Sequence, residues 1–320
     1  MSKETLHAAI DLGTTKVCTL VVHLHPSGAM EVVGRGVAPS QGVKKGVVVS
    51  LTEAQEAVRA SVEEAGRTAS TLVPWAYVSV SGSHLETFPR WGSTRCPHYS
   101  LPLSYEEIDR AVEAAYPAEL PPEKQVLHLI PRTYAVDGLK GVRNPIGMHA
   151  LRLDVETLCV VGAVAPIQSL VRAVEGAHVR VRSLILGGVA TGEAVLARDE
   201  KEMGVVLVEI GGGVTTVAVY QQGSLWAASV LPVGGYQFTN DLAVALNTPY
   251  EMAEEVKVRY GHAMPEGLGE EKVEVNVFGD RLPAKVDRRE VCGYLRERAE
   301  ELLRLVHQKV KALGFPVLPP

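Results

Sequence analysis

A strand–turn–strand pattern opens the chain and returns in its second half. The apolar run at residues 8–10 leads into Asp11-Leu12-Gly13-Thr14-Thr15-Lys16, and another apolar run follows at 17–22. In the second copy, the apolar run at 205–208 leads into Glu209-Ile210-Gly211-Gly212-Gly213-Val214-Thr215-Thr216, and a further run follows at 217–220. Apolar runs on either side of a glycine turn predict β-hairpins. Two copies with the same order of residue types predict an internal duplication.

Apolar positions three or four residues apart predict a helix after the first hairpin. It starts at Ser50, which would form a capping box with Glu53, and it ends at Gly66. A strand, helix and strand in this order predict a right-handed crossover in a mixed α/β sheet. The strands expected around this helix are at residues 31–38, 46–49 and 76–81.

Two further helices carry a similar start signal. One starts at Ser104 with Glu107, and the last starts at Asp287 with Glu290 and ends at Gly314. In the last helix, acidic residues alternate with basic ones and no aromatic residue anchors the apolar side. Core packing is therefore favoured over a membrane-surface helix. Its apolar stripe consists of Val291, Leu295, Leu302, Leu303, Val306 and Val310.

The composition limits the classes of function. A chain of 320 residues exceeds what one small core usually serves, so two lobes are expected. The net charge of -5 argues against nucleic acid as the main partner. No window reaches the roughly 20 apolar residues of a membrane span, and the N-terminus has no signal-peptide core. The widely spaced cysteines argue against a disulfide framework or a zinc site and fit a reducing cytoplasm: Cys18, Cys96, Cys159 and Cys292.

The residue types in the two turns are suited to binding phosphate and metal. Glycines let backbone N–H groups approach an anion, and threonine hydroxyls add donors. A carboxylate at the end of the first strand, Asp11 or Glu209, can hold Mg²⁺ through water. A single turn of this kind is usually only a hairpin turn, but two facing turns would hold a nucleoside triphosphate from both sides. The candidate phosphate-binding residues are Gly13, Thr14, Thr15, Lys16, Gly211, Gly212, Gly213 and Thr215.

A series of segments, in order along nearly the whole chain, resembles the FtsA family of bacterial cell-division proteins. This series is more specific than the phosphate hairpins, which some chaperones, sugar kinases and other actin-like proteins also have. The segments are at residues 9–20, 36–49, 80–84, 127–138, 144–147, 234–242 and 253–261.

The resemblance implies an α/β, actin-like two-lobe fold of the duplicated ribonuclease H-like type, with the family's inserted subdomain 1C. Members of the family continue past the last helix with further strands, an adenine-binding turn and a membrane-binding helix. The chain is therefore expected to lack the last strands of subdomain 2A. The implied ranges are 1–82 and 157–187 for 1A, 83–156 for 1C, 188–230 and 301–320 for 2A, and 231–300 for 2B.

The resemblance also implies a site for ATP and Mg²⁺. In FtsA-like proteins, a glycine pair after a strand approaches the phosphates, and an E-x-x-K motif on a helix contacts the sugar and base. The residues alone leave simpler readings open, namely a strand-to-helix turn and a solvated ion pair. The additional ATP contacts implied are Gly234, Gly235, Glu254 and Lys257, and the implied Mg²⁺ ligands are Asp11 and Glu209.

Several positions near the implied phosphates depart from the family's pattern. Glu209 stands in place of an aspartate and is longer by one methylene. Val214 and Thr216 replace a threonine and an aspartate, and Gly187 stands where an acidic residue is common. Binding rests on many backbone contacts, whereas hydrolysis needs a few placed side chains. We therefore expect ATP binding with weak or absent ATPase activity.

The resemblance implies partners at the division site. Family members bind the C-terminal tail of the tubulin-like FtsZ on 2B, assemble head-to-tail with themselves, and contact other division proteins through 1C. They act at the cytoplasmic face of the membrane, reached through a tail that is expected to be missing here. Basic residues suit an acidic tail, although a solvated basic rim is the alternative. The basic residues in 2B are Lys257, Arg259, Lys285, Arg288 and Arg289.

Two other functions fit the same fold. One is a cytoplasmic actin-like adaptor of pilus assembly. The other is a kinase of the sugar or acetate kinase type, which needs a catalytic carboxylate and an acceptor pocket that the sequence does not identify. The 1C-like segment and the AEEVKVRYG stretch at 253–261 favour cell division.

Overall fold

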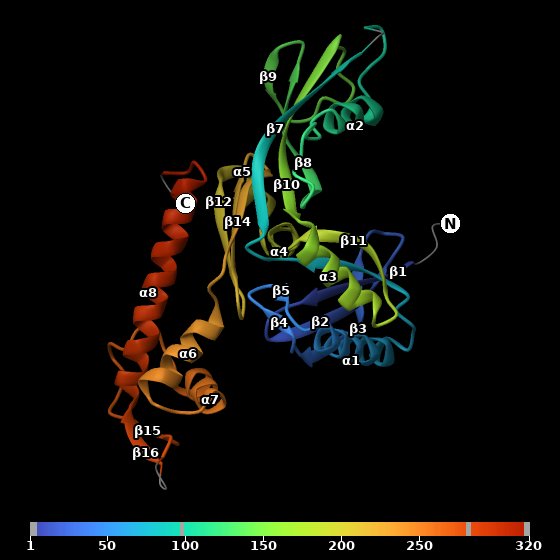
Figure 1. Ribbon diagram of the computed structural model, residues 1–320. Helices are drawn as coiled ribbons and strands as arrows, with labels where there is room; N and C mark the ends of the chain where they lie inside the picture. Colours follow the sequence, from blue (N-terminus) through green and yellow to red (C-terminus); the bar gives the residue numbers. More distant parts are fainter. Residues whose placement is uncertain (1–4, 97–98, 280–282, 317–320) are drawn as a thin grey trace.

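A five-stranded sheet forms the centre of the N-terminal lobe in the computed structural model, which describes residues 5–96, 99–279 and 283–316. In spatial order its strands are β11 (Arg180–Leu186), β6 (Trp75–Val80), β1 (Thr5–Leu12), β2 (Lys16–Leu24) and β3 (Met30–Pro39). The last three are antiparallel, whereas β6 and β11 run parallel to β1. Helices α1 (Leu51–Ala69) and α3 (Val164–Glu175) pack on one face of the sheet (Figure 1).

The crossover predicted from the strand–helix–strand pattern is confirmed, because β6 pairs in parallel with β1 after α1. The strands expected at 31–38 and 76–81 are β3 and β6. The strand expected at 46–49 is instead one half of a two-stranded ribbon, β4 (Val43–Lys44) with β5 (Val47–Val48).

Helix α1 starts at Ser50 as predicted, but its predicted capping box and its predicted end differ from the structure. The side chain of Ser50 makes no capping hydrogen bond, so the predicted capping box is wrong. Glu53 lines the cleft between the lobes instead of reaching back to Ser50. The helix also continues past Gly66, and Ser70 ends it in the left-handed conformation with φ of 52°.

A four-stranded antiparallel sheet with one helix forms the inserted lobe at the top of Figure 1. The predicted capping box of its helix is confirmed, because Ser104 Oγ accepts from the Glu106 N–H and the Glu107 carboxylate accepts from the Ser104 N–H. In spatial order the strands are β7 (Leu85–Arg95), β10 (Arg152–Ala163), β8 (Lys124–Val136) and β9 (Leu139–Val142), and the helix is α2 (Tyr105–Glu113).

The C-terminal lobe repeats the opening hairpin of the N-terminal lobe. Its antiparallel sheet contains β12 (Val205–Ile210), β13 (Thr215–Gln221) and β14 (Ser224–Leu231). Helices α4 (Gly187–Val195) and α5 (Arg198–Met203) contact this sheet, and α4 also contacts β6 and β11 of the N-terminal lobe. Below the sheet lie α6 (Gly235–Ala245), α7 (Tyr250–Tyr260), β15 (Lys272–Val275) and β16 (Ala284–Asp287) (Figure 1).

The last helix, α8 (Arg288–Ala312), joins two hydrophobic cores. Val291 and Leu295 pack with α6 and α7, whereas Leu302 and Val306 pack on β13 and β14. Core packing of this helix is therefore confirmed, although Leu303, a predicted member of the stripe, is 59% exposed.

The start of α8 differs in one detail from the predicted capping box. Asp287 caps the helix by accepting from the Arg289 N–H, as expected of an N-cap. The carboxylate of Glu290, however, accepts from the Tyr294 hydroxyl at 3.1 Å instead of closing the box.

Among the described residues, no helix combines the length and the apolar character that crossing a membrane requires.

Candidate functional site

The two glycine turns of the duplicated hairpins lie against each other. Each is closed in the same way: the Gly13 N–H donates to the Lys16 carbonyl at 3.1 Å, and the Gly211 N–H donates to the Val214 carbonyl at 2.9 Å. A Cβ atom on Gly213 would lie 2.5 Å from Oγ1 of Thr14. We call residues 11–16 the first turn and residues 209–216 the second turn. A Cβ atom on Gly212 would lie equally close to Thr15, so the contact between the turns leaves no room for a side chain at Gly212 or Gly213.

The N–H groups at the centre of these turns are suited to an anion. In the described part of the chain, those of Thr14, Thr15, Gly212 and Gly213 donate to no protein acceptor. Successive N–H groups without acceptors in a turn form a concave site for anions such as phosphate. The structure therefore brings together, from both lobes, unused N–H groups of four of the eight residues that the sequence suggested for phosphate. The N–H groups of Gly13 and Gly211 instead close the turns.

A cavity of about 680 Å³ lies beside the two turns and between the lobes. This volume is in the range of small-molecule sites. It is closed on one side by the β4–β5 ribbon and on the other by the starts of α6 and α7. Its lining residues include Thr14, Thr15, Ser40, Lys44, Lys45, Glu53, Gly213, Tyr236, Gln237, Asn240 and Tyr250.

Several of these lining residues were not predicted from the sequence as site residues. Lys44 and Lys45 place two positive charges on the N-terminal wall of the cavity. Tyr236 and Tyr250 stack on the opposite wall with ring centroids 5.0 Å apart. In the sequence, the two lysines stand next to each other between Gly42 and Gly46, which could have suggested a basic turn. The structure confirms a turn there, because Lys45 has a φ of 51°. The stacked tyrosines gave no local signal, because they come from two different helices.

The two predicted metal ligands lie near the meeting point of the turns. Asp11 accepts a hydrogen bond from the Ser79 hydroxyl, and Glu209 accepts one from the Thr191 hydroxyl at 3.0 Å. Burial raises the pKa of the Glu209 carboxyl above its ordinary value, and the negative charge of Asp11 adds to the rise, whereas the bond from Thr191 opposes it. A divalent cation would relieve both the burial cost and this repulsion. The residues present thus fit a magnesium ion.

Three buried positions in or near the second turn, Thr215, Thr216 and Gly187, are not among the residues that line the cavity. Thr215 is fully buried and donates to the Val233 carbonyl at 2.8 Å, so it supports the turn and does not face the cavity as predicted. Thr216 is 2% exposed. At Gly187, a Cβ atom would lie 2.2 Å from Oγ of Ser81, so the serine hydroxyl fills the space where the family commonly has an acidic side chain.

The glycine pair at the start of α6 supports the second turn from behind. The Gly235 N–H donates to the Gly211 carbonyl at 2.9 Å, and the Tyr236 N–H donates to the Gly212 carbonyl at 2.7 Å. The Gly234 N–H donates to the side chain of Gln237. These donors are therefore used within the protein. In this structure the pair positions the second turn, which differs from the direct phosphate contact expected of Gly234 and Gly235.

The predicted E-x-x-K pair forms a compact network between α6 and α7. Lys257 Nζ lies 2.6 Å from the Glu254 carboxylate and donates to the Thr239 hydroxyl at 2.8 Å. It also lies 3.4 Å from the Gly235 carbonyl, directly below the second turn. Neither Glu254 nor Lys257 is among the residues that line the cavity. The contacts of Lys257 hold it between α6 and α7, so it is less accessible to a peptide than the exposed basic residues of the predicted set.

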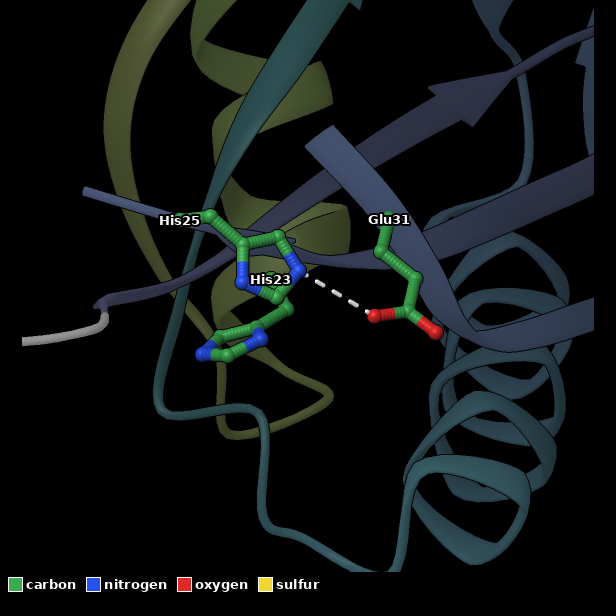
Figure 2. Close-up of side chains that lie close together, drawn as sticks. All are labelled: His23, His25 and Glu31. Atoms are coloured by element: carbon green, nitrogen blue, oxygen red, sulfur yellow. Dashed lines mark hydrogen bonds and ion pairs between the residues drawn. The ribbon is translucent and has the colours of Figure 1, made fainter. Parts of the chain in front are cut away.

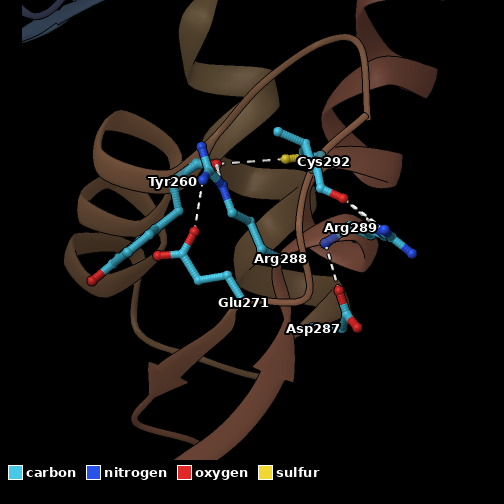
Figure 3. A network of polar contacts seen from close by, with 7 residues as sticks. Tyr260, Glu271, Asp287, Arg288, Arg289 and Cys292 are labelled. Atoms are coloured by element: carbon cyan, nitrogen blue, oxygen red, sulfur yellow. Dashed lines mark hydrogen bonds and ion pairs between the residues drawn. The ribbon is translucent and has the colours of Figure 1, made fainter. Parts of the chain in front are cut away.

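Two other basic residues of that set hold a loop in place (Figure 3). Arg288 donates to the Tyr260 carbonyl at 2.9 Å and to the Glu271 carboxylate at 2.6 Å. Arg289 donates twice to the Leu268 carbonyl, at 2.9 and 2.6 Å. Both guanidinium groups thus fasten the loop after α7 to the start of α8. Reversing their charge would disturb this loop, so it would not test peptide binding alone.

Arg259 and Lys285 are the exposed basic residues of the predicted set. The side chain of Arg259 is 66% exposed and pairs with Glu255 on the same helix. The side chain of Lys285 is 65% exposed and lies 3.7 Å from Glu274 on the neighbouring strand. Exposed ion pairs of this kind contribute little to stability. Their positive charges remain accessible to a partner.

Comparison with known proteins relates the chain to one family. The model described as "Cell division protein FtsA" matches residues 206–317, and that of the "SHS2 domain inserted in FTSA" matches residues 82–161. Among curated proteins, the cell division protein FtsA of Pseudomonas aeruginosa is 35% identical over 312 residues. This match covers 97% of the chain and 74% of the Pseudomonas protein.

Solved structures with the same arrangement have an actin-like fold. The PilM-PilN type IV pilus biogenesis complex matches with a TM-score of 0.66 and 15% identity, over 99% of this chain and 80% of that one. MreB5 of Spiroplasma citri bound to ADP matches with a TM-score of 0.55 and 13% identity, over 98% of this chain and 80% of that one. At these identities the similarity shows the fold alone, and it confirms the predicted actin-like class.

Proposed function

This chain belongs to the FtsA family of cell-division proteins, and we propose that it binds ATP with Mg²⁺ in the cleft between its lobes. We further propose that it assembles head-to-tail with copies of itself and links the FtsZ ring to the cytoplasmic face of the membrane. The inserted domain favours this function over pilus assembly, because residues 82–161 match the form of the domain found in FtsA.

The contact between the two glycine turns is the observation that carries the ATP proposal. Unused N–H donors from both lobes lie beside a cavity of nucleotide size, with Lys44 and Lys45 on one wall. The stacked rings of Tyr236 and Tyr250 provide a flat surface on the other wall. Aromatic faces of this kind suit a sugar or a base. Asp11 and Glu209 would hold Mg²⁺ in this arrangement, where the ion would neutralise phosphate charge.

Binding should be readily measurable, whereas turnover should be slow. Titration of the chain with ATP in a calorimeter should give one site per chain in the presence of Mg²⁺. Removing Mg²⁺ with a chelator should weaken binding, because Asp11 and Glu209 would then face the phosphates without a cation between them. Phosphate release should be far below the roughly 10 per second of a typical enzyme.

Two results would count against this proposal separately. Release of phosphate at rates typical of metabolic kinases would contradict slow turnover, because Val214, Thr216 and Gly187 leave no placed catalytic group among the described residues of the turns. Absence of ATP binding at millimolar concentration would contradict the site itself.

For the FtsZ link, we propose that an acidic tail peptide docks near the exposed cations of α7 and β16. The variant Arg259→Glu with Lys285→Glu should weaken binding of a fluorescent FtsZ tail peptide by about tenfold, because two attractive charges become repulsive. It should also reduce the dependence of binding on salt. Within the described residues, both side chains form ion pairs with exposed acidic residues, so the folded structure should remain.

A double charge reversal on other surfaces provides the matched control. Lys140→Glu with Arg198→Glu makes the same change in net charge at exposed positions on β9 and α5. If both double variants bind the peptide equally, only the net charge matters and the proposed surface is wrong.

A further inference from the structure

Two histidines and a glutamate meet where the β2–β3 hairpin closes (Figure 2). His23 and His25 are two residues apart, so their side chains lie on the same face of the strand. Glu31 stands opposite His23 on β3 in the register of the sheet. The hairpin is fixed by a hydrogen bond from the His25 N–H to the Ala29 carbonyl and another from Gly28 back to His25, both 2.9 Å.

The three side chains point toward one another. One potential ligand atom from each of His23, His25 and Glu31 lies within 4.8 Å of the other two. The shortest approach is 3.2 Å, between Nε2 of His25 and Oε2 of Glu31. The two imidazole rings meet edge to face with centroids 4.5 Å apart. Figure 2 shows the Glu31 carboxylate directed at the His25 ring.

We propose that this cluster binds a divalent transition metal, with Zn²⁺ as the favoured ion. Two imidazole nitrogens and one carboxylate oxygen are a usual set of three protein ligands for zinc, with the fourth position open to water or another ligand. Bonds from zinc to nitrogen and oxygen are about 2.0–2.2 Å long, so tetrahedral geometry places the ligand atoms about 3.4 Å apart. Small side-chain rotations would bring the three atoms from their present separations to that spacing.

The ligand chemistry separates this site from the one for nucleotide. Mg²⁺ prefers oxygen ligands and keeps much of its water, so two imidazoles select against it. The cluster lies at the far end of β2 from the first turn, roughly 27 Å away along the strand. The proposal therefore stands independently of ATP binding.

The sequence predicted that a zinc site was unlikely because of the cysteine spacing. Cysteine spacing carries no information about histidines on a hairpin.

Zinc titration of the tag-free, reduced protein tests the proposal. Calorimetry in a non-chelating buffer should show one Zn²⁺ per chain, and millimolar Mg²⁺ should leave the affinity unchanged. His23→Ala, His25→Ala and Glu31→Gln should each weaken binding by about tenfold or more, because each removes one of three ligands. Zn²⁺ should raise the melting temperature of the parent more than that of any of these variants.

His307→Ala is the matched control, since it removes an exposed histidine on α8 far along the chain from the hairpin. It should bind Zn²⁺ as the parent does. Glu31→Gln keeps the size of the side chain, and circular dichroism should confirm that all variants remain folded. If the variant lacking both His23 and His25 binds Zn²⁺ as tightly and in the same ratio as the parent, the cluster is only an ion pair between His25 and Glu31.

Discussion

Replacement of Gly234 by alanine is expected to weaken ATP binding by about ten- to a hundredfold. The backbone of Gly234 is extended, with φ of −163°, so the requirement for glycine concerns space and not conformation. A Cβ atom there would lie 2.5 Å from the Gly211 carbonyl oxygen. That atom belongs to the backbone of the second turn, so the turn itself must move. Overpacking typically costs about 1–3 kcal/mol, and each 1.4 kcal/mol lost from binding is about tenfold in affinity.

The neighbouring glycine provides a control with the same substitution. A Cβ atom on Gly235 would meet its nearest atom, the Gly211 carbonyl oxygen, at 3.7 Å, which is an ordinary contact. Gly235→Ala should therefore retain ATP affinity, as measured by the same calorimetric titration. Equal losses in Gly234→Ala and Gly235→Ala would show that α6 does not position the turn in this way.

The second large effect should be on folding, in the variant Gly36→Ala. Gly36 lies on β3 directly beneath α1, where a Cβ atom would come within 1.9 Å of the Ser61 carbonyl oxygen. The Ser61 hydroxyl donates to the Gly36 carbonyl at 3.0 Å, and its oxygen lies 2.8 Å from the hydroxyl oxygen of Thr19. Separating helix from strand would strain these buried bonds. We expect a loss of about 3 kcal/mol in the free energy of unfolding.

Urea denaturation followed by circular dichroism measures this loss, and Gly293→Ala is its control. Gly293 lies inside α8 with no atom near its Cβ position. Alanine there should raise stability by roughly 0.5–1 kcal/mol, because glycine loses more conformational freedom in a helix. If Gly36→Ala unfolds at the same urea concentration as the parent, the contact between α1 and β3 is less tight than described.

Local patterns predicted the parts of the fold that depend on neighbours in sequence. The two hairpins are encoded by apolar runs on either side of a glycine turn, and the Ser104 cap by two residues three apart. The crossover from β1 to β6 followed because a helix between two strands has few ways to pack. The same local logic failed at Ser50, because Glu53 lies at the cleft instead of closing a capping box.

Roles set by tertiary contacts were beyond the sequence. Thr215 has the right chemistry for phosphate, but the alternation along β13 places its hydroxyl against Val233. Arg288 and Arg289 are basic, but their guanidinium groups bind the carbonyls of Tyr260 and Leu268 and hold a loop in place. The tyrosine pair is formed by residues from two helices, so no spacing within one segment reveals it. Resemblance to a family helped with the general position of the site, not with these individual contacts.

The continuous course of α8 bears on how the cleft can open. Its 25 residues span about 37 Å without a break, and its two halves are anchored in different cores. Rotation of α6 and α7 against the β12–β14 sheet would have to bend this helix. We therefore expect the C-terminal lobe to move as one rigid body. In the described chain the lobes are joined covalently where β11 enters α4, at Gly187 and Gly188. We therefore expect the lobes to rotate relative to each other about this connection when they close on a ligand.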